Sequence, residues 1–290
     1  MALRQALREG RLLVHYQPVV DLTSGRWTGL EALVRWLHPE RGLLSPAGFI
    51  GVAEESQLID EVGRFVLVRA CKELAELRST FPPAHDLRLA VNVSVRQLSR
   101  PGFAAELSKL TEELDMVPSN LAVEITESLL MGDLDVPGSN SVAISELVAL
   151  RGLGVTVLVD DFGTGFSSLS YLRDLPVDAV KVDPSFVSGG RESLQDPAIV
   201  TAIVDLARAL DLEVVAEGIE SDEQWTELRK LGCTTGQGYL FGQPTAIEDI
   251  ARRMVIEAPA PVPAPHRRHA HVRRARMARR RPHPAGRPPR

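Results

Sequence analysis

The segment VTVLVDD at residues 155–161 decides the fold, because an apolar run ends there in two adjacent carboxylates. A short run rich in Val and Leu predicts a buried β-strand. Asp160 and Asp161 are the last two residues of this predicted strand. A packed core rejects unpaired carboxylates, so both must be hydrated, hydrogen-bonded or bound to a metal ion.

The same arrangement recurs along the chain. Further apolar segments that predict strands lie at 12–19, 28–36, 87–93, 121–126, 178–183, 213–217 and 236–241. Four more polar residues stand where such strands end, namely Glu31, Asn92, Glu124 and Glu217. Any one of them alone could cap a helix or close a surface turn. Their coincidence at separate strand ends favours a shared site.

The order of the elements predicts an α/β fold, a modified TIM-like (β/α)8 barrel with one antiparallel strand. Eight strands alternating with helices over about 245 residues match the size of such a barrel. Residues 21–25 alone separate the first two strands, so we expect these to form an antiparallel hairpin. A doubly wound open sheet is the alternative, but it would use one crevice, whereas polar residues here end nearly every strand. Helical patterns occupy 60–78, 102–114, 141–151, 167–174, 196–210 and 222–231, with helix starts at Asp196-Pro197 and Ser221.

The donor types at the strand ends predict a site for divalent cations. All are carboxylates or an amide, with no His or Cys among them, which suits Mg²⁺ or Mn²⁺ rather than Zn²⁺. Six donors exceed what one Mg²⁺ usually takes from a protein, so we expect two ions that share a bridging carboxylate. The expected donors are Glu31, Asn92, Glu124, Asp160, Asp161 and Glu217.

Lys181 is expected to add a cationic side chain to the inside of the barrel. It alternates with Val180 and Val182, so when those two face the helices, Lys181 faces the carboxylates. It either balances their charge or orients and deprotonates a water, and the sequence leaves both roles open. Gln237 brings an amide to the eighth strand, and Arg35 on the second strand could pair with a phosphate.

Charge divides the chain into two parts. Ten of its 33 basic side chains and none of its 38 acidic ones lie in residues 258–290, so residues 1–257 carry a formal charge of −15. An acidic folded part argues against duplex nucleic acid as a ligand. We expect residues 1–257 to form the barrel and residues 258–290, rich in Pro, Ala, Arg and His, to be a disordered basic tail.

The cysteine count and the hydropathy bear on the compartment. Cys71 and Cys233 provide no disulfide framework, which fits a reducing cytosol. No signal-peptide pattern opens the sequence, and no apolar stretch reaches ~18 residues. We therefore expect a cytoplasmic chain without a membrane span.

Several motifs together resemble one family. Glu31-Ala32-Leu33 opens the stretch EALVRWLHPERG, and NVS, EITES, DDFGTGFSSL, KVD, AEGIE and QGYLF follow in that order. Jointly they resemble the EAL-domain cyclic di-GMP phosphodiesterases over roughly residues 3–250, although the triplet EAL alone carries no information. The resemblance implies a modified barrel, two Mg²⁺ or Mn²⁺ ions, and hydrolysis of cyclic di-GMP to linear pGpG in bacterial signalling.

The resemblance also implies roles for individual residues. The six oxygen donors correspond to metal ligands, and Lys181, supported by Gln237 and with Glu31 as a further catalytic residue, corresponds to the group that activates the water. Glu127 corresponds to a glutamate that steadies the loop starting at Asp161, a loop tied in the family to metal binding and dimer-linked regulation. Substrate contacts are implied for Gln17, Leu33, Arg35 and Asp183.

Three functions compete at this point. The first is an active phosphodiesterase, the second a non-catalytic cyclic di-GMP receptor, and the third an unrelated metal-dependent barrel enzyme acting on a sugar or acid. Degenerate receptors lose the EAL glutamate, the paired aspartates or the lysine, all of which are present here. We also expect a homodimer, and a chain that is either the catalytic part of a longer multidomain signalling protein or a standalone EAL protein.

Overall fold

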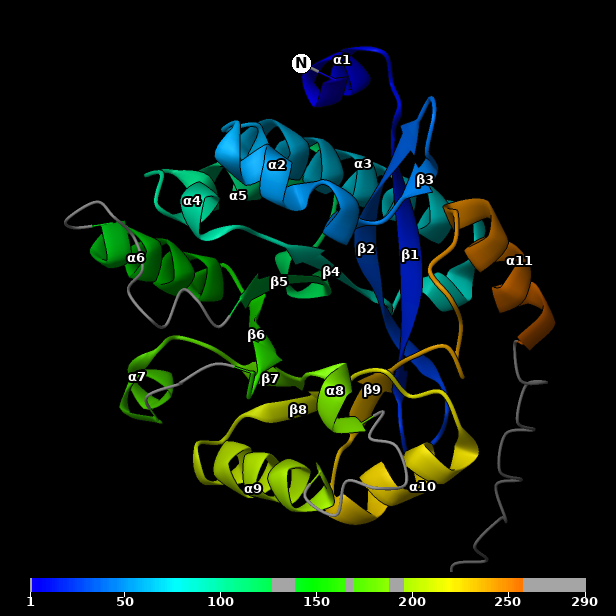
Figure 1. Cartoon of the computed structure of the whole chain (residues 1–290), viewed down its shortest axis with the longest axis vertical. Coiled ribbons are helices and arrows are strands. Elements are labelled where there is room, and N and C mark those ends of the chain that lie inside the picture. The colour runs from blue at the N-terminus through cyan, green and yellow to red at the C-terminus, as the bar shows by residue number, and fades with distance from the viewer. Residues whose placement is uncertain (1, 127–138, 165–168, 188–195, 258–290) are drawn as a thin grey trace, which may run out of the picture. The chain divides into compact units, whose positions relative to one another are not determined.

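The computed structural model describes residues 2–126, 139–164, 169–187 and 196–257, whose strands close into a barrel (Figure 1). The strands follow the order β1-β9-β8-β7-β6-β5-β4-β2-β3, and β1 also pairs with β2, which closes the ring and leaves β3 outside it. Their bounds are β1 (Leu12–Asp21), β2 (Trp27–His38), β3 (Gly42–Leu44), β4 (Arg88–Asn92), β5 (Leu121–Thr126), β6 (Thr156–Phe162), β7 (Ala179–Val182), β8 (Glu213–Ala216) and β9 (Thr235–Gln237).

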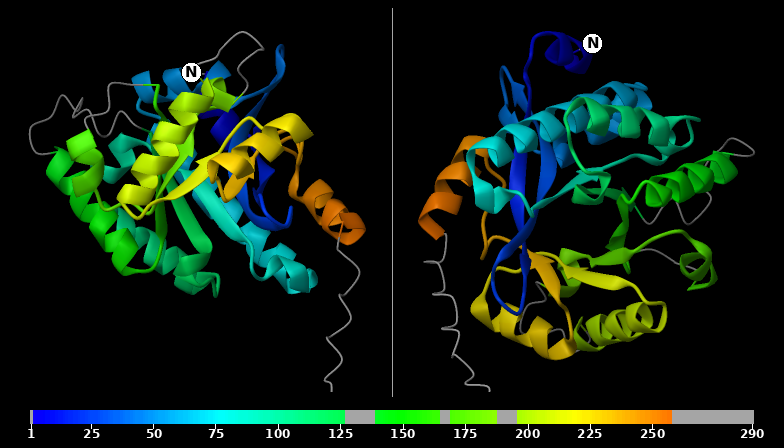
Figure 2. Two further views of the ribbon diagram at one scale, coloured as in Figure 1. Left: turned by 90° about the horizontal axis from the view of Figure 1, so that it is seen from below. Right: turned by 180° about the vertical axis from the view of Figure 1, so that it is seen from behind.

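Helices surround the strands in both views of Figure 2. They are α1 (Ala2–Arg8), α2 (Ile50–Glu55), α3 (Ile59–Thr80), α4 (Val95–Leu98), α5 (Phe103–Glu113), α6 (Ser139–Gly152), α7 (Leu169–Asp174), α8 (Pro184–Val187), α9 (Asp196–Ala209), α10 (Asp222–Leu231) and α11 (Ile247–Glu257), with 3₁₀ turns at Pro46–Gly48, Pro82–Ala84 and Pro118–Asn120. Among the described helices, none has both the length and the apolar character that crossing a bilayer would require.

The hairpin prediction is confirmed. β1 and β2 run antiparallel with Gln17 opposite Glu31, while β2, β4, β5, β6, β7, β8 and β9 pair in parallel. The predicted helix starts are also confirmed: α9 begins at Asp196, and the Ser221 hydroxyl accepts from the Gln224 amide at the start of α10. The Gln224 side chain accepts in return from the Ser221 amide, which completes a capping box.

Two predicted features differ from the structure. The strand expected at 236–241 ends at Gln237, because the backbone amide of Leu240 donates to Ile219 O (3.0 Å) and the chain turns there, with Phe241 N donating to Gly238 O (3.1 Å). β3 was not expected. It pairs with β2 beyond the barrel, Leu43 opposite Leu37, and its three residues are too few to show a period.

The side chains inside the barrel form layers that differ in chemistry. Successive residues of a strand point to opposite faces, so residues two apart share a face. The polar strand-end residues form one layer. Beneath them lies an apolar cluster that is separate from the main core between sheet and helices. Its members are Ala90, Ala122, Leu158, Ala179 and Val215.

Candidate active site

Lys181 is the centre of the polar layer. It lies on β7, only 1% exposed, and its Nζ is close to carboxylates from four other segments of the barrel. One of these, Glu31, lies inside β2, which continues to His38, and not at the end of its strand as expected. The distances from Nζ are 2.8 Å to Glu217 Oε1, 3.0 Å to Glu124 Oε2, 3.0 Å to Asp160 Oδ1 and 3.7 Å to Glu31 Oε2. In the structure, Lys181 thus faces these carboxylates, as the sequence predicts.

Two amides join the carboxylates to one another. Asn92 Nδ2 donates to Glu31 Oε1 (2.9 Å) and to Glu124 Oε2 (3.3 Å). Gln237 Nε2 donates to Glu31 Oε2 (2.6 Å) and to Glu217 Oε1 (2.9 Å). Glu31 is therefore held from both sides, and its carboxylate orientation is fixed before any ligand arrives.

The adjacent aspartates reach the same site because β6 is irregular at its end. Alternation would send Asp160 and Asp161 to opposite faces, but the pairing of β6 with β7 shifts register between Val159 and Phe162. Asp161 adopts a left-handed backbone with φ 55°, and its amide donates to Asp160 Oδ1 (3.0 Å). Such a conformation is uncommon for a residue other than Gly, and Asp tolerates it better than most. The bulge therefore turns both carboxylates toward one place.

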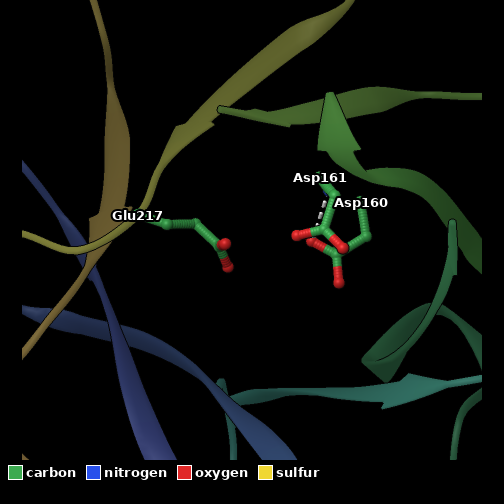
Figure 3. A group of neighbouring side chains, drawn as sticks. All are labelled: Asp160, Asp161 and Glu217. Atoms are coloured by element: carbon green, nitrogen blue, oxygen red, sulfur yellow. Dashed lines mark hydrogen bonds between the residues drawn. The ribbon is translucent and has the colours of Figure 1, made fainter. Parts of the chain in front are cut away.

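Asp160, Asp161 and Glu217 can together hold a metal ion. Each offers a carboxylate oxygen, and these oxygens lie within 4.8 Å of one another. Figure 3 shows Glu217 reaching from the end of β8 toward the pair on β6, with the hydrogen bond between the aspartates dashed. Three oxygens that converge from two strands suit a hard divalent cation.

Three carboxyl groups of the cluster have raised pKa values, because they are buried and because the carboxylates outnumber the ammonium of Lys181. Burial first, and then the charge of Glu31, raises the pKa of Glu124 well above its usual range. Burial, with the charges of Asp160 and Glu31, raises the pKa of Glu217 to about 8. Burial and the neighbouring Asp160 raise the pKa of Asp161 to about 6. One lysine does not neutralise this group of acids.

Glu31 and Lys181 are shifted the other way. Burial pushes the pKa of Glu31 up, but Lys181 and the hydrogen bonds from Gln237 and Asn92 outweigh it, so the pKa is lowered. Burial alone would lower the pKa of Lys181, but the carboxylates around it, Glu124 and Glu31 foremost, raise that pKa well above its usual value. An ammonium beside a carboxylate is therefore the stable state of this pair.

An open cavity of about 340 Å³ adjoins the cluster, and two of the expected substrate contacts line it. Gln17 and Leu33 both face this space, and Gln17 Nε2 donates to Gly242 O (3.2 Å). Arg35 follows Leu33 on the same face of β2, and burial lowers its pKa. Asp183 does not line the cavity. Its carboxylate accepts from Ser185 N (2.8 Å) at the start of α8.

Some lining residues were missed by the sequence analysis. Tyr239, 58% exposed, and Gly218, Glu220 and Pro184 also face the cavity. Tyr239 could have been found from the sequence, because it lies two residues after Gln237 and alternation along a strand would place both on one face. Pro184 packs so closely on Gly218 that a Cβ at position 218 would lie 2.7 Å from the Pro184 Cβ. Glu127 and the segment 258–290 lie outside the described residues.

Comparison with known proteins agrees with this architecture. The sequence pattern of the EAL domain matches residues 1–244. Cyclic di-GMP phosphodiesterase NbdA of Pseudomonas aeruginosa is 44% identical over 264 residues, which are 90% of this chain and 33% of NbdA. The chain spans about a third of the length of the curated relatives it matches.

Solved structures share the barrel. The structure described as PaMucR phosphodiesterase in complex with c-di-GMP superposes with a TM-score of 0.78 at 39% identity, covering 86% of this chain and 97% of that one. The EAL enzyme Bd1971, in its cAMP- and cyclic-di-GMP-bound form, gives a TM-score of 0.81 at 35% identity over 87% of this chain and 67% of its own. The fold and the site together define a class of barrel proteins in which carboxylates surround a buried lysine. Within that class, the chain belongs to the EAL domain family.

Proposed function

We propose that this protein is a metal-dependent phosphodiesterase that hydrolyses cyclic di-GMP to linear pGpG. The observation that carries the proposal is the meeting of Lys181 with four carboxylates from separate strands, beside an open cavity. The names of NbdA and of the PaMucR complex add support from relatives that cover most of this chain.

The residues present fit divalent cations. The donors are all oxygens, the acids exceed the positive charge of Lys181, and Gln237 Oε1 is buried without a hydrogen-bond partner in the described chain. We propose two Mg²⁺ or Mn²⁺ ions, held by Glu31, Asn92, Glu124, Asp160, Asp161 and Glu217. When bound, such ions lower the pKa of a water and offset the negative charge of a phosphodiester.

In this proposal, the protein's own residues position the reactants. Lys181 Nζ is protonated among Glu124, Asp160 and Glu217, so it acts first as a donor that orients the attacking water. A neutral lysine that could take the proton requires part of the surrounding negative charge to be cancelled. Gln237 fixes Glu31 and Glu217 from the other side.

The substrate occupies the open cavity in this proposal. Gln17 and Leu33 line it, and Arg35 lies just beyond Leu33 as a partner for a phosphate. Asp183, expected as a further substrate contact, adjoins Asp161 instead and raises its pKa. We therefore propose that Asp183 affects the substrate through Asp161.

The test is a turnover assay. Purified protein is incubated with cyclic di-GMP and Mg²⁺ or Mn²⁺, with and without EDTA, and the products are separated by chromatography. The proposal expects pGpG that disappears with chelator and returns with added cation. Binding of cyclic di-GMP without product would instead favour a receptor, and neither binding nor product would favour a different barrel enzyme.

We further propose a cytoplasmic homodimer built from the barrel, residues 1–257, with residues 258–290 as a separate basic tail. Cys71 and Cys233 are both free and buried, which suits a reducing compartment.

On α6, Ile144 is 40% exposed and Val148 is 56% exposed, one turn apart, and an apolar pair of this kind suits a partner helix.

The dimer is tested on that helix face. Ile144→Asp is expected to convert the protein to monomer in analytical ultracentrifugation, because it places a charge in the apolar contact. Glu112→Lys, a charge change on α5, serves as the matched control. A dimer that survives Ile144→Asp unchanged would place the interface elsewhere.

A further inference from the structure

The barrel is hollow beneath the candidate active site. The five residues of the apolar cluster each lie two positions before a residue of the polar layer on the same strand, as Ala122 does before Glu124 and Ala179 before Lys181. They therefore face the inside of the barrel, one layer below the site. Interiors of such barrels are usually filled by bulky Val, Ile and Leu side chains. Here Ala90, Ala122 and Ala179 supply only methyl groups.

A cavity of about 520 Å³ occupies this space. It extends from Glu124 and Gln237 at its upper end to the N-terminal ends of the strands. Gly29 on β2 also lines the cavity and adds no side chain. A Cβ there would lie 2.9 Å from Arg88 O, so the close approach of β2 and β4 favours glycine at this position. The volume lies within the range of pockets that hold small organic ligands, about 300–1,000 Å³.

The mouth of the cavity carries two arginines, Arg26 and Arg88, both exposed. Neither forms an ion pair with any part of the chain that the structure describes, so both guanidinium groups are free to receive an anion. Three acids share the mouth, Asp21, Asp86 and Glu213. The carboxylate of Asp21 already accepts from Ser24 N (2.6 Å) and Ser24 Oγ (2.7 Å).

This charge pattern limits the ligand. Arginine forms paired hydrogen bonds with a carboxylate or sulfonate, and two such groups suffice for one anionic head. The three acids outnumber the two arginines, so they repel a ligand of several negative charges, such as a nucleotide, and a single anionic head must contact the guanidinium groups directly. Above the mouth, the walls are largely apolar, formed by Ala122, Ala179, Leu158 and Val215. Polar groups return at the upper end, where Glu124 and Gln237 line the cavity.

We propose that this cavity is a second binding site, for a small amphipathic monoanion. Its apolar body lies against Ala122, Ala179 and Val215, and its anionic head pairs with Arg88 and Arg26. The site opens at the end of the barrel opposite the cyclic di-GMP cavity. The inference stands on the cavity and its mouth alone, so it holds whether or not the protein hydrolyses cyclic di-GMP.

Decanoate is the probe, because it joins a flexible apolar chain to one carboxylate. Isothermal titration calorimetry on the full chain is expected to give saturable binding. Arg88→Gln should weaken binding by about tenfold or more, since it removes a charge-assisted hydrogen bond. Arg41→Gln, another exposed arginine but in the turn between β2 and β3, is the matched control and should leave affinity unchanged.

Filling the cavity gives a second variant test. Ala122→Leu and, independently, Ala179→Leu place three more carbon atoms in the space that the ligand body would occupy. Each should reduce decanoate binding by tenfold or more, and circular dichroism reports whether the variant is folded. Ala70→Leu is not a suitable control, because Ala70 is part of the main core.

A measurement on the unaltered protein removes dependence on variant folding. With methyl-labelled Ala and Val, nuclear Overhauser effects from decanoate methylenes are expected at the Ala122, Ala179 and Val215 methyls. Absence of binding at millimolar decanoate, contacts confined to surface methyls, or affinity unaffected by Arg88→Gln would each overturn the proposal.

Discussion

Lys181 determines whether the acids around it can remain charged. Removal of this side chain leaves Glu31, Glu124 and Glu217 buried together without a cation. Loss of one partner of a buried ion pair costs about 3–5 kcal/mol, because the remaining charge is uncompensated. The variant should therefore be less stable without metal and should recover when divalent cations bind.

We predict that Lys181→Met reduces turnover by about 10²–10⁴-fold, the range expected when a positioned proton-transfer group is lost. Met keeps a similar length without the charge. Chromatographic detection of pGpG measures the rate, and thermal melting in EDTA and in Mg²⁺ measures stability. Lys230→Met, on an exposed lysine paired with Glu227 (3.1 Å), is the control and should change neither quantity. Normal turnover in Lys181→Met would remove Lys181 from the mechanism.

The two thiols give a residue-level test of burial and pH. Burial raises the pKa of Cys71 to about 12 and that of Cys233 to about 11. Because the folded values exceed the unfolded value near 8.5, the neutral thiols favour folding below about pH 8.5, and that contribution is lost as the pH rises through the folded values.

We predict that iodoacetamide at pH 8.5 leaves both cysteines unmodified in the native protein, since the thiolate reacts and about 1% or less is present. Mass spectrometry counts the added groups. In denaturant both thiols should react within minutes. Rapid labelling of the native protein would mean that Cys71 or Cys233 is more accessible than its burial indicates.

At the scale of elements, α11 fixes the loop that carries Tyr239. Figure 1 shows α11 beside β1. Arg253 on this helix donates from Nη2 to Phe241 O (2.6 Å), and its guanidinium lies 5.1 Å from the centre of the Trp27 ring. Gly242, next in the chain, accepts from the Gln17 side chain that lines the cavity. The helix thus acts on the site through this loop.

We predict that Arg253→Met raises KM severalfold with a smaller change in kcat, because it loosens Gln17 and Tyr239 and leaves the Lys181 cluster intact. The lost hydrogen bond and cation–π contact amount to about 1–3 kcal/mol of stability. Arg252→Met is the matched control, since Arg252 is exposed and, within the described residues, its ion pair is with Asp249 on the same helix. An equal loss in both variants would contradict a role for this contact.

Some elements of the fold and of the site could be predicted from the sequence, and others could not. Val-rich strands with carboxylates predicted the barrel and the members of the cluster, because a carboxylate in a buried strand needs a hydrogen-bond partner or a metal ion. The five residues between β1 and β2 predicted the antiparallel pair. The bulge that brings Asp161 beside Asp160 depends on pairing with β7, and α11 contacts segments far away in sequence. Neither leaves a local periodic signal.

At the scale of the whole molecule, charge is the dominant constraint. Residues 1–257 carry a formal charge of −15, and the proposed substrate is a dianion. Repulsion of like charge opposes binding unless cations intervene, so the metals should be needed for affinity as well as for chemistry. Cyclic di-GMP affinity measured in EDTA should accordingly be much weaker than affinity in Ca²⁺ for a variant that does not turn over, such as Lys181→Met.

The basic segment tests whether the barrel is sufficient for activity. Helix α11 ends at Glu257, and every residue assigned to the site precedes it. We predict that a chain ending at Glu257 keeps kcat and KM within about twofold, because none of the residues assigned to the site would be removed. Removal of ten arginines makes the protein more acidic, so a modest rise in KM at low salt that vanishes at 0.15 M salt, roughly, would reflect long-range charge alone. A large loss of kcat would show instead that residues 258–290 take part in the catalytic unit.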